Sequence, residues 1–176
     1  MKLTTLLDGW TRTGKLALIG VVLLLFGCQS LILDPRGHQV PQDRRIMIPD
    51  SGEQTGVFEN EDLRLAYKII RTPGQLRILG SLGFTDRISR NFPVVTYFHL
   101  GVMLLDEQGK ILDMANLTSV SFYQTQYATI PDYPLAFSSL ISLRENTRSI
   151  AFNYTGNAYE PGPDGGMMDF WEYPVY

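Results

Sequence analysis

The chain has 176 residues with 15 basic and 18 acidic side chains, so its formal net charge at neutral pH is −3. It lacks the basic footprint that nucleic-acid or polybasic membrane-surface binding needs, and residues 101–176, with 3 basic and 9 acidic side chains, are more acidic still. The single cysteine, Cys28, excludes an intramolecular disulfide and any zinc or iron–sulfur site built on several thiolates.

The N-terminal part combines a positive region with a short apolar run. Three basic side chains precede residues 16–27, which are twelve consecutive apolar or small residues. This length is typical of a signal-peptide core and is short for a transmembrane helix. An uncleaved membrane anchor is the alternative, because residues 16–33 contain only two clearly polar side chains and could span with little to spare.

The apolar run ends in Leu25, Phe26, Gly27 and Cys28, which resemble the lipobox of bacterial lipoproteins. In that class a peptidase cuts before the cysteine, whose sulfur carries a diacylglycerol. The resemblance therefore implies removal of residues 1–27, a lipid on Cys28 and a location in the bacterial cell envelope, facing the periplasm. Phe26 departs from the pattern, which usually has a smaller residue there. The glutamine after the cysteine resembles the signal for sorting to the outer membrane in enteric bacteria.

Residues 28–62 have the composition of a flexible tether. They contain several turn signals, and residues 53–62 are mostly polar. The sequence Ile-Met-Ile at residues 46–48 interrupts this stretch and could form a short edge strand. The remaining residues, 63–176, suffice for one domain with a single hydrophobic core.

The domain begins with a predicted β-hairpin. Residues 63–70 alternate between apolar and polar side chains, as a half-buried strand does. A helix is the alternative, since Asn60 could cap it and Pro73 would end it. We favour the strand because residues 72–75, Thr-Pro-Gly-Gln, fit a type II turn. Residues 75–84 then alternate again.

The rest of the domain also reads as strands. Residues 94–105 are apolar on both faces, as in a central strand, and a turn at Gly109 leads to a returning strand at 111–117. Further strands are expected at 120–127, 135–143, 149–155 and 167–173, and residues 160–166 (EPGPDGG) are predicted to be a loop. Seven to eight short strands with regular turns predict an all-β fold, an antiparallel β-sandwich.

Two stretches support a more specific architecture. Residues 102–112 (VMLLDEQGKIL) and 148–156 (RSIAFNYTG) resemble immunoglobulin-like and fibronectin-III-like domains. The resemblance implies an immunoglobulin-like sandwich. The Cys–Trp–Cys hallmark of antibody domains is absent, so the resemblance extends to architecture alone.

The sequence predicts no catalytic residue, no metal site and no cofactor. His38 falls in the tether and His99 in the central strand, where a buried histidine bonded to a backbone carbonyl is expected. No nucleotide-binding or Gly-x-Ser-x-Gly motif is present. Glu160, Asp164 and Asp169 flank the glycine-rich loop and could gather around calcium, but a solvated acidic loop is favoured because no calcium-binding spacing is met.

Aromatic residues near the C-terminus are the remaining candidates for a binding surface. Phe170, Trp171 and Tyr173 lie in the last predicted strand. Strand aromatics usually pack in a core, but outward-facing ones would suit a glycan or protein partner. The leading hypothesis is a non-enzymatic envelope lipoprotein whose sandwich docks onto another envelope component, which we expect to be a protein. Alternatives are a glycan- or peptidoglycan-binding module, an accessory subunit held by an uncleaved helix, and a hydrolase with an unfamiliar site.

Overall fold

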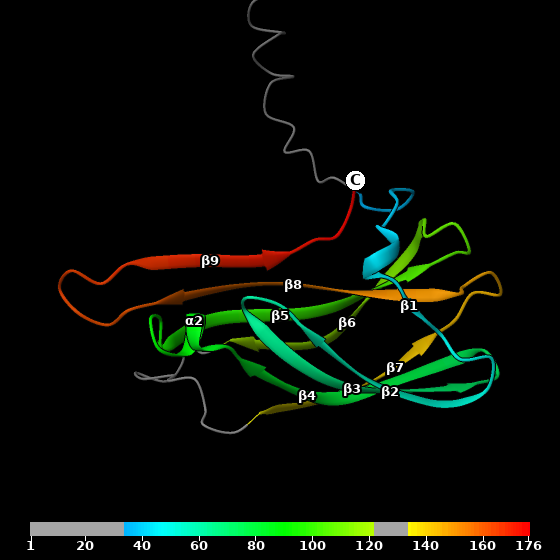
Figure 1. Ribbon diagram of the computed structural model, residues 1–176, viewed down its shortest axis with the longest axis horizontal. Coiled ribbons are helices and arrows are strands. Elements are labelled where there is room, and N and C mark those ends of the chain that lie inside the picture. The colour runs from blue at the N-terminus through cyan, green and yellow to red at the C-terminus, as the bar shows by residue number, and fades with distance from the viewer. Residues whose placement is uncertain (1–33, 122–133) are drawn as a thin grey trace, which may run out of the picture. The chain divides into compact units, whose positions relative to one another are not determined.

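The computed structural model describes residues 34–121 and 134–176, and these fold almost entirely as β-structure (Figure 1). The strands are β1 (Ile46–Met47), β2 (Gly52–Glu59), β3 (Leu63–Thr72), β4 (Gln75–Phe84), β5 (Val94–Leu105), β6 (Ile111–Ser121), β7 (Leu135–Ser142), β8 (Ser149–Tyr159) and β9 (Met167–Glu172). Two short helical turns, η1 (Gln42–Arg44) and α2 (Asp86–Ser89), complete the described part.

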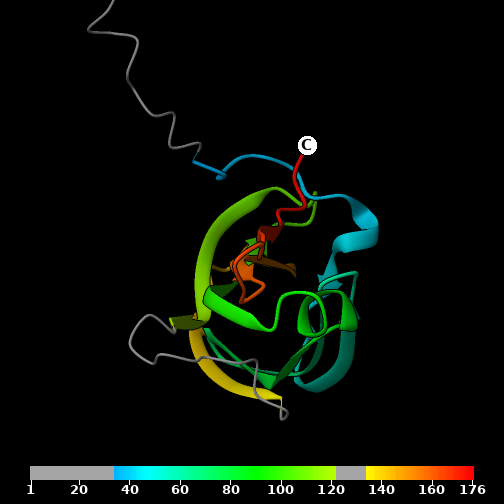
Figure 2. The same cartoon turned by 90° about the vertical axis from the view of Figure 1, so that its left-hand side faces the viewer.

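The strands form two antiparallel sheets that enclose a shared interior (Figure 2). One sheet has the order β2-β3-β4-β7. The other sheet has β6, β5 and β8 as successive neighbours. The free edge of β8 is shared: β1 pairs with the beginning of β8, and β9 pairs with its later part. The predicted all-β antiparallel sandwich is confirmed. The described residues hold nine strands, against seven to eight expected. β1 and β2 precede the predicted domain, whereas the strand expected at 111–117 and the start of the one expected at 120–127 form a single strand, β6.

The strand order is that of an immunoglobulin-like sandwich. If β3, β4, β5, β6, β7, β8 and β9 are lettered A, B, C, C′, E, F and G, the pairs A–B and B–E lie in one sheet. The pairs C–C′, C–F and F–G lie in the other. These are neighbours in immunoglobulin-type domains. Here β2 extends the first sheet beyond strand A.

The predicted strands agree closely with those observed. β4 and β5 have the expected bounds, and Gly74 between β3 and β4 has a φ of 71°, as the third position of the predicted type II turn requires. The helix considered for residues 63–70 is not adopted. The strand expected at 120–127 is the end of β6 at its first two residues, and its remainder lies outside the described residues.

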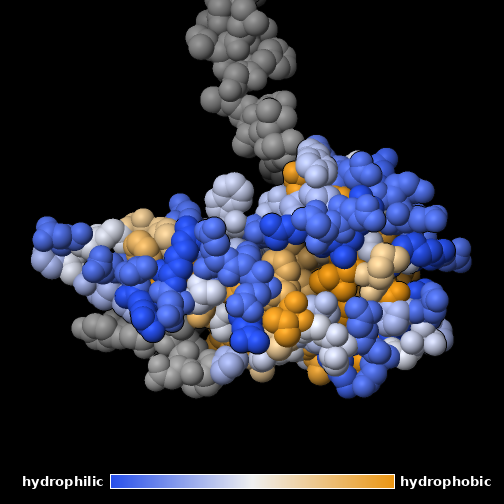
Figure 3. Space-filling view, viewed as in Figure 1, coloured by the Kyte–Doolittle hydropathy of each residue, from blue (hydrophilic) through white to orange (hydrophobic). Residues whose placement is uncertain are grey.

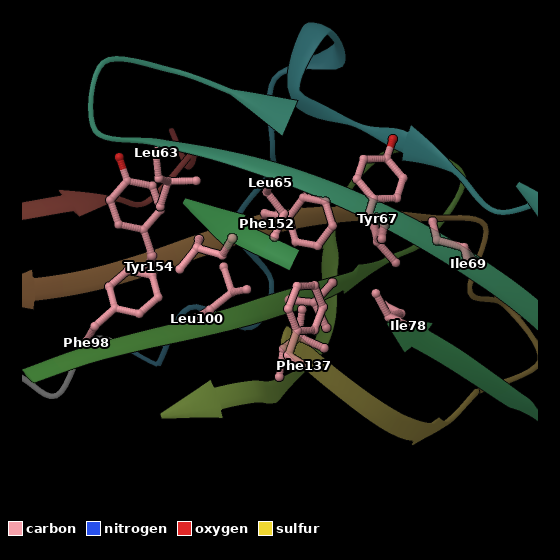
Figure 4. Packing of buried hydrophobic residues seen from close by; sticks show 14 of the residues in the cluster. Leu63, Leu65, Tyr67, Ile69, Ile78, Phe98, Leu100, Phe137, Phe152 and Tyr154 are labelled. Carbon is pink, nitrogen blue, oxygen red and sulfur yellow. The ribbon is translucent and has the colours of Figure 1, made fainter. Parts of the chain in front are cut away.

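The core lies between the sheets and is rich in aromatic rings. Leu65 of β3 points toward Phe152 of β8 and Leu100 of β5 (Figure 4). Phe98 packs against Tyr154 with ring centroids 6.1 Å apart. On the side seen in Figure 3 the surface is mostly polar, and apolar side chains reach it in a band between the two sheets.

The tether predicted over residues 28–62 is wrong from Pro35 onward, because the folded unit begins there. Val40 is fully buried, and Ile48 belongs to the main core. The polar stretch that suggested a tether contains β2, an edge strand paired with β3 along all eight of its residues. Its polar composition reflects an edge strand with one face toward solvent, where alternating polar residues carry little penalty.

The outer face of the β6-β5-β8 sheet is partly covered by the two ends of the folded unit. Val40 forms a second apolar cluster there with Met103, Leu105, Ile111 and Ala151, and Val175 packs against it. Backbone hydrogen bonds hold these segments: the Val40 N–H donates to the Gly109 carbonyl at 2.9 Å and the Tyr176 N–H to the Gln39 carbonyl at 3.1 Å. His38, expected in the tether, lies 3.1 Å through Nδ1 from the carbonyl of Tyr176.

Candidate functional site

Two rows of side chains cross the uncovered part of this outer face. Directly paired residues on neighbouring strands project from the same side of a sheet, so the strand register defines the rows. The first row consists of Trp171 (β9), Thr155 (β8), His99 (β5) and Ser119 (β6). The second consists of Tyr173 (just after β9), Asn153 (β8), Gly101 (β5) and Asn116 (β6).

A groove with a volume of about 510 Å³ lies over these rows. Gly101 is at its floor. A Cβ atom there would lie 2.8 Å from Oδ1 of Asn153 and 3.3 Å from the carbonyl oxygen of Ala115. The missing side chain therefore keeps the hollow open and lets the Asn153 amide lie across β5.

Aromatic side chains border the groove on its β9 side. The indole of Trp171 is 67% exposed. The hydroxyl of Tyr173 donates to the sulfur of Met114 at 3.2 Å, so this side chain reaches from the β9 edge to β6. Tyr173 therefore separates the groove from the apolar cluster around Val40, which Met114 and Val175 also contact.

A histidine–serine pair lies at the β6 rim. Nδ1 of His99 is 2.8 Å from the hydroxyl oxygen of Ser119, and that oxygen accepts a hydrogen bond from the Asn116 amide at 2.7 Å. The ring of His99 is exposed, and its centroid lies 5.9 Å from that of Tyr97. This corrects the expectation of a buried core histidine: His99 faces outward because Phe98 and Leu100, on either side of it, fill the interior.

The lining of the groove is uncharged. Within the described ranges it contains no aspartate, glutamate, lysine or arginine. The lining residues are His99, Leu100, Gly101, Met114, Ala115, Asn116, Asn153, Tyr154, Thr155, Trp171 and Tyr173. Tyr154 contributes from the core side, and burial, followed by its hydrogen bond to Asp62, raises the pKa of its phenol. The groove thus offers aromatic rings, amides and hydroxyls without formal charge.

A second hollow, of about 590 Å³, lies near η1 and the turn between β5 and β6. Arg45, Arg148, Asp106 and Glu107 line it, so both signs of charge are present. Its two arginines bond to nearby backbone carbonyls: Arg45 to that of Val40 at 2.9 Å, and Arg148 to those of Glu145 and Thr147. These arginines brace turns, and the hollow is a weaker candidate than the groove.

The three aromatic residues predicted as a surface have two different environments. Trp171 and Tyr173, the latter 38% exposed, border the groove. Phe170 is only 2% exposed and packs in the main core, so its prediction as a surface residue is wrong. The reason is the strand period of two, which turns Phe170 inward when Trp171 faces out. Cys28 and the lipobox residues Leu25, Phe26 and Gly27 lie outside the described residues.

The acidic residues of the loop at 160–166 do not converge. Asp169 accepts a hydrogen bond from the Asn157 amide at 2.7 Å, across the β8–β9 pair. No group of three or more His, Cys, Asp or Glu residues placed to hold a metal ion occurs in the described ranges.

Sequence reasoning missed three polar residues that line the groove, Asn153, Thr155 and Asn116, and also Ser119 at its rim. Asn153 and Thr155 lie in the strand predicted at 149–155 and Asn116 in the strand predicted at 111–117, but none of the four was assigned to a binding surface. One signal was available, since Gly101 interrupts an otherwise apolar central strand. A glycine there often marks a place where another group approaches the backbone closely.

No family model matches the chain, and comparisons with curated proteins and with solved structures gave no match either. Within residues 34–121 and 134–176, neither helix is long and apolar enough to cross a membrane.

Proposed function

We propose that this protein is a non-enzymatic binding module of the bacterial cell envelope, anchored by a lipid on Cys28 and capturing another envelope component in the groove. The observation that carries the proposal is the exposed indole of Trp171 beside an uncharged hollow. Tryptophan and tyrosine supply large rigid contact areas, and they are favoured anchors in binding surfaces.

The anchor and the folded unit lie close together along the chain. Only seven residue steps separate Cys28 from Pro35, where the folded unit begins. A fully extended chain spans at most about 3.5 Å per residue, so these steps cover no more than about 25 Å. With a lipid on Cys28, the domain would be held near the bilayer, and its partner would be a component within that reach. The acyl chains of a mature lipoprotein would hold it firmly.

The anchor can be tested directly. We expect wild-type protein to incorporate a palmitate analogue, to lack residues 1–27 by mass spectrometry and to fractionate with the outer membrane. Cys28→Ala should abolish the label and the cleavage. A wild type that takes up no label, with Cys28→Ala still bound to the membrane, would favour the uncleaved anchor. If the wild-type protein is recovered wholly in the inner membrane, the inference that it is sorted to the outer membrane is wrong.

The capture role can be tested with a matched pair of variants. Met167 and Trp171 are both strongly exposed on β9, but only Trp171 borders the groove. We expect Trp171→Ala to lose components that wild-type protein captures from solubilised membranes, whereas Met167→Ala retains them. Equal capture by both variants would contradict the proposal.

The His99–Ser119 pair favours a second candidate, a hydrolase. A serine nucleophile requires a histidine base that a third group orients, and here Nδ1 of His99 faces the serine while Asn116 donates to the same hydroxyl. An amide donating to the nucleophilic oxygen lowers its reactivity. We therefore expect no labelling of Ser119 by a fluorophosphonate probe. Labelling of the wild-type protein that is lost in His99→Ala would instead support the hydrolase.

A further inference from the structure

We propose that the groove binds a neutral saccharide chain, with one sugar ring stacked on Trp171 and hydroxyl groups bonded to Asn153 and the neighbouring polar side chains. This inference rests on the proposed function, because it names the chemistry of what the groove captures. Three observations carry it: the absence of charge in the lining, the uncommitted polar atoms, and the exposed indole.

The charge of the lining restricts the ligand. A ligand with carboxylate, phosphate or ammonium groups would lose hydration in the groove, and the described lining contains no lysine, arginine, aspartate or glutamate to replace it. The net charge of the whole chain is negative, so anionic polymers also meet unfavourable long-range potential. An uncharged ligand matches this site.

The polar atoms of the groove distinguish a saccharide from an apolar peptide. Oδ1 of Asn153 is already buried without a hydrogen-bond partner, and the amide nitrogen of the same side chain also has none in the described part of the chain. Neither the Thr155 hydroxyl nor the Trp171 indole N–H has one in residues 34–121 and 134–176. An apolar ligand would cover these groups and leave them unpaired, which is unfavourable. Sugar hydroxyls both donate and accept, so they can satisfy amides, hydroxyls and an indole N–H together.

The aromatic residues supply the apolar part of the recognition. One face of a pyranose ring presents C–H groups that pack on the flat indole, while the ring edge keeps its hydroxyls free to bond. Trp171 shares a row with Thr155 and His99, so a ring stacked on the indole has polar neighbours along the sheet. The groove volume of about 510 Å³ lies within the roughly 300–1,000 Å³ of ordinary ligand sites.

Trp171 is its own reporter in the test. The chain has two tryptophans, Trp10 and Trp171, so Trp10→Phe protein in detergent has indole fluorescence from the groove alone, with or without residues 1–27. Four tetrasaccharides would be titrated: β-1,4-linked N-acetylglucosamine, cellotetraose, maltotetraose and the charged tetragalacturonate. We expect a saturable spectral change with at least one neutral chain, and at least tenfold weaker binding of tetragalacturonate. No saturation by any neutral chain up to about 10 mM would overturn the inference.

Variants separate stacking from unspecific effects, with affinities measured by calorimetry. Trp171→Ala should weaken binding of the neutral chain at least tenfold, and Met167→Ala should stay within twofold. Asn153→Asp keeps the shape but adds a charge, and we expect at least a fivefold loss. Equal affinities for wild type, Trp171→Ala and Asn153→Asp would refute the site.

The result can also be separated from failure of the proposed function. If membrane components are captured in a Trp171-dependent and protease-sensitive manner while no neutral saccharide binds, the partner is a protein: the saccharide inference is wrong and the capture role stands. If neither membrane components nor saccharides bind, both proposals fail.

Discussion

The phenol of Tyr154 donates a 2.7 Å hydrogen bond to the carboxylate of Asp62, 92 positions earlier in the chain. Tyr154 lies in β8 beneath the groove, whereas Asp62 lies just before β3 in the facing sheet. Asp62 is only 5% exposed and also pairs with Arg87 of α2. The Asn60 amide donates to the same phenol at 2.6 Å. This network ties the strand under the groove to the opposite sheet.

Tyr154→Phe should lower the free energy of unfolding by about 1–2 kcal/mol, because it leaves the buried Asp62 carboxylate without one of its donors. Urea unfolding followed by circular dichroism measures the change. Tyr97→Phe is the matched control, since the Tyr97 hydroxyl has no hydrogen-bond partner in the described part of the chain. Equal stability of the two variants would show that the hydrogen bond contributes nothing measurable.

Tyr154 also predicts a sensitivity to alkali. Burial, and then the hydrogen bond to Asp62, raise the pKa of Tyr154 above its usual value of 10.0. The phenol therefore ionises more easily in the unfolded chain, so its stabilisation is full below pH 10 and is lost as the pH rises further. Between pH 9 and 11 we expect the wild type to lose about 1 kcal/mol more than Tyr154→Phe. Parallel pH profiles of the two proteins would rule out this linkage.

Asp113 should give the opposite pH dependence, because its contribution to the free energy of unfolding is lost at acidic pH. The Met114 N–H, with added attraction from Arg36 and Arg144, lowers the pKa of its carboxyl group. A lowered folded pKa gives stability that is present above the unfolded pKa of about 4 and lost as the pH falls through the folded value. At pH 7, Asp113→Asn should lower the free energy of unfolding by less than about 1 kcal/mol, because the ion pairs are partly exposed. The difference from wild type should shrink as the pH falls below about 4. A constant difference across the range would exclude this cause.

The fold was predictable where local rules agree. Alternation over β3 left a helix open, but the type II turn at Gly74 favoured a hairpin, and the apolar run of β5 favoured a central strand. The start of the unit was not predictable in this way. Val40 is an isolated apolar residue among polar ones, and its burial depends on the segment at Gly109 and Ile111, far away in the sequence.

The groove was predictable only in part. Trp171 stood out by residue type, but alternation alone cannot say whether Phe170 or Trp171 faces inward. That choice depends on the register of β9 against β8, which pairs Trp171 with Thr155. Asn153, Gly101 and Asn116 come from three strands, and only the pairing of those strands brings them together.

Truncation tests the corrected domain boundary. A fragment of residues 35–176 should be soluble and unfold cooperatively. A fragment of residues 63–176 lacks β2, which exposes the hydrogen-bonding edge of β3 and removes Phe58 from its contact with Phe152, 5.7 Å between ring centroids. We expect this shorter fragment to aggregate or melt at a much lower temperature. Melting of both fragments at the same temperature would restore residues 35–62 to the role of a tether.

Replacing the neighbouring residues Phe170 and Trp171 by alanine should change the free energy of unfolding by very different amounts. Phe170 packs against Phe84 at 5.9 Å and Phe98 at 6.1 Å between ring centroids, so Phe170→Ala should lower the free energy of unfolding by about 3–5 kcal/mol. Trp171 is two-thirds exposed, so Trp171→Ala should change that free energy by no more than about 0.5 kcal/mol.

Binding should show the reverse order. Loss of a central aromatic anchor typically costs about 2 kcal/mol, so Trp171→Ala should weaken partner capture about thirtyfold. Phe170→Ala should affect capture only through the fraction of unfolded protein, and lowering the temperature should recover it. Urea unfolding and capture measured on the same two samples decide the matter. A Trp171→Ala protein that loses several kcal/mol of stability would place the indole in the core, and one unchanged in both measurements would exclude it from the binding site.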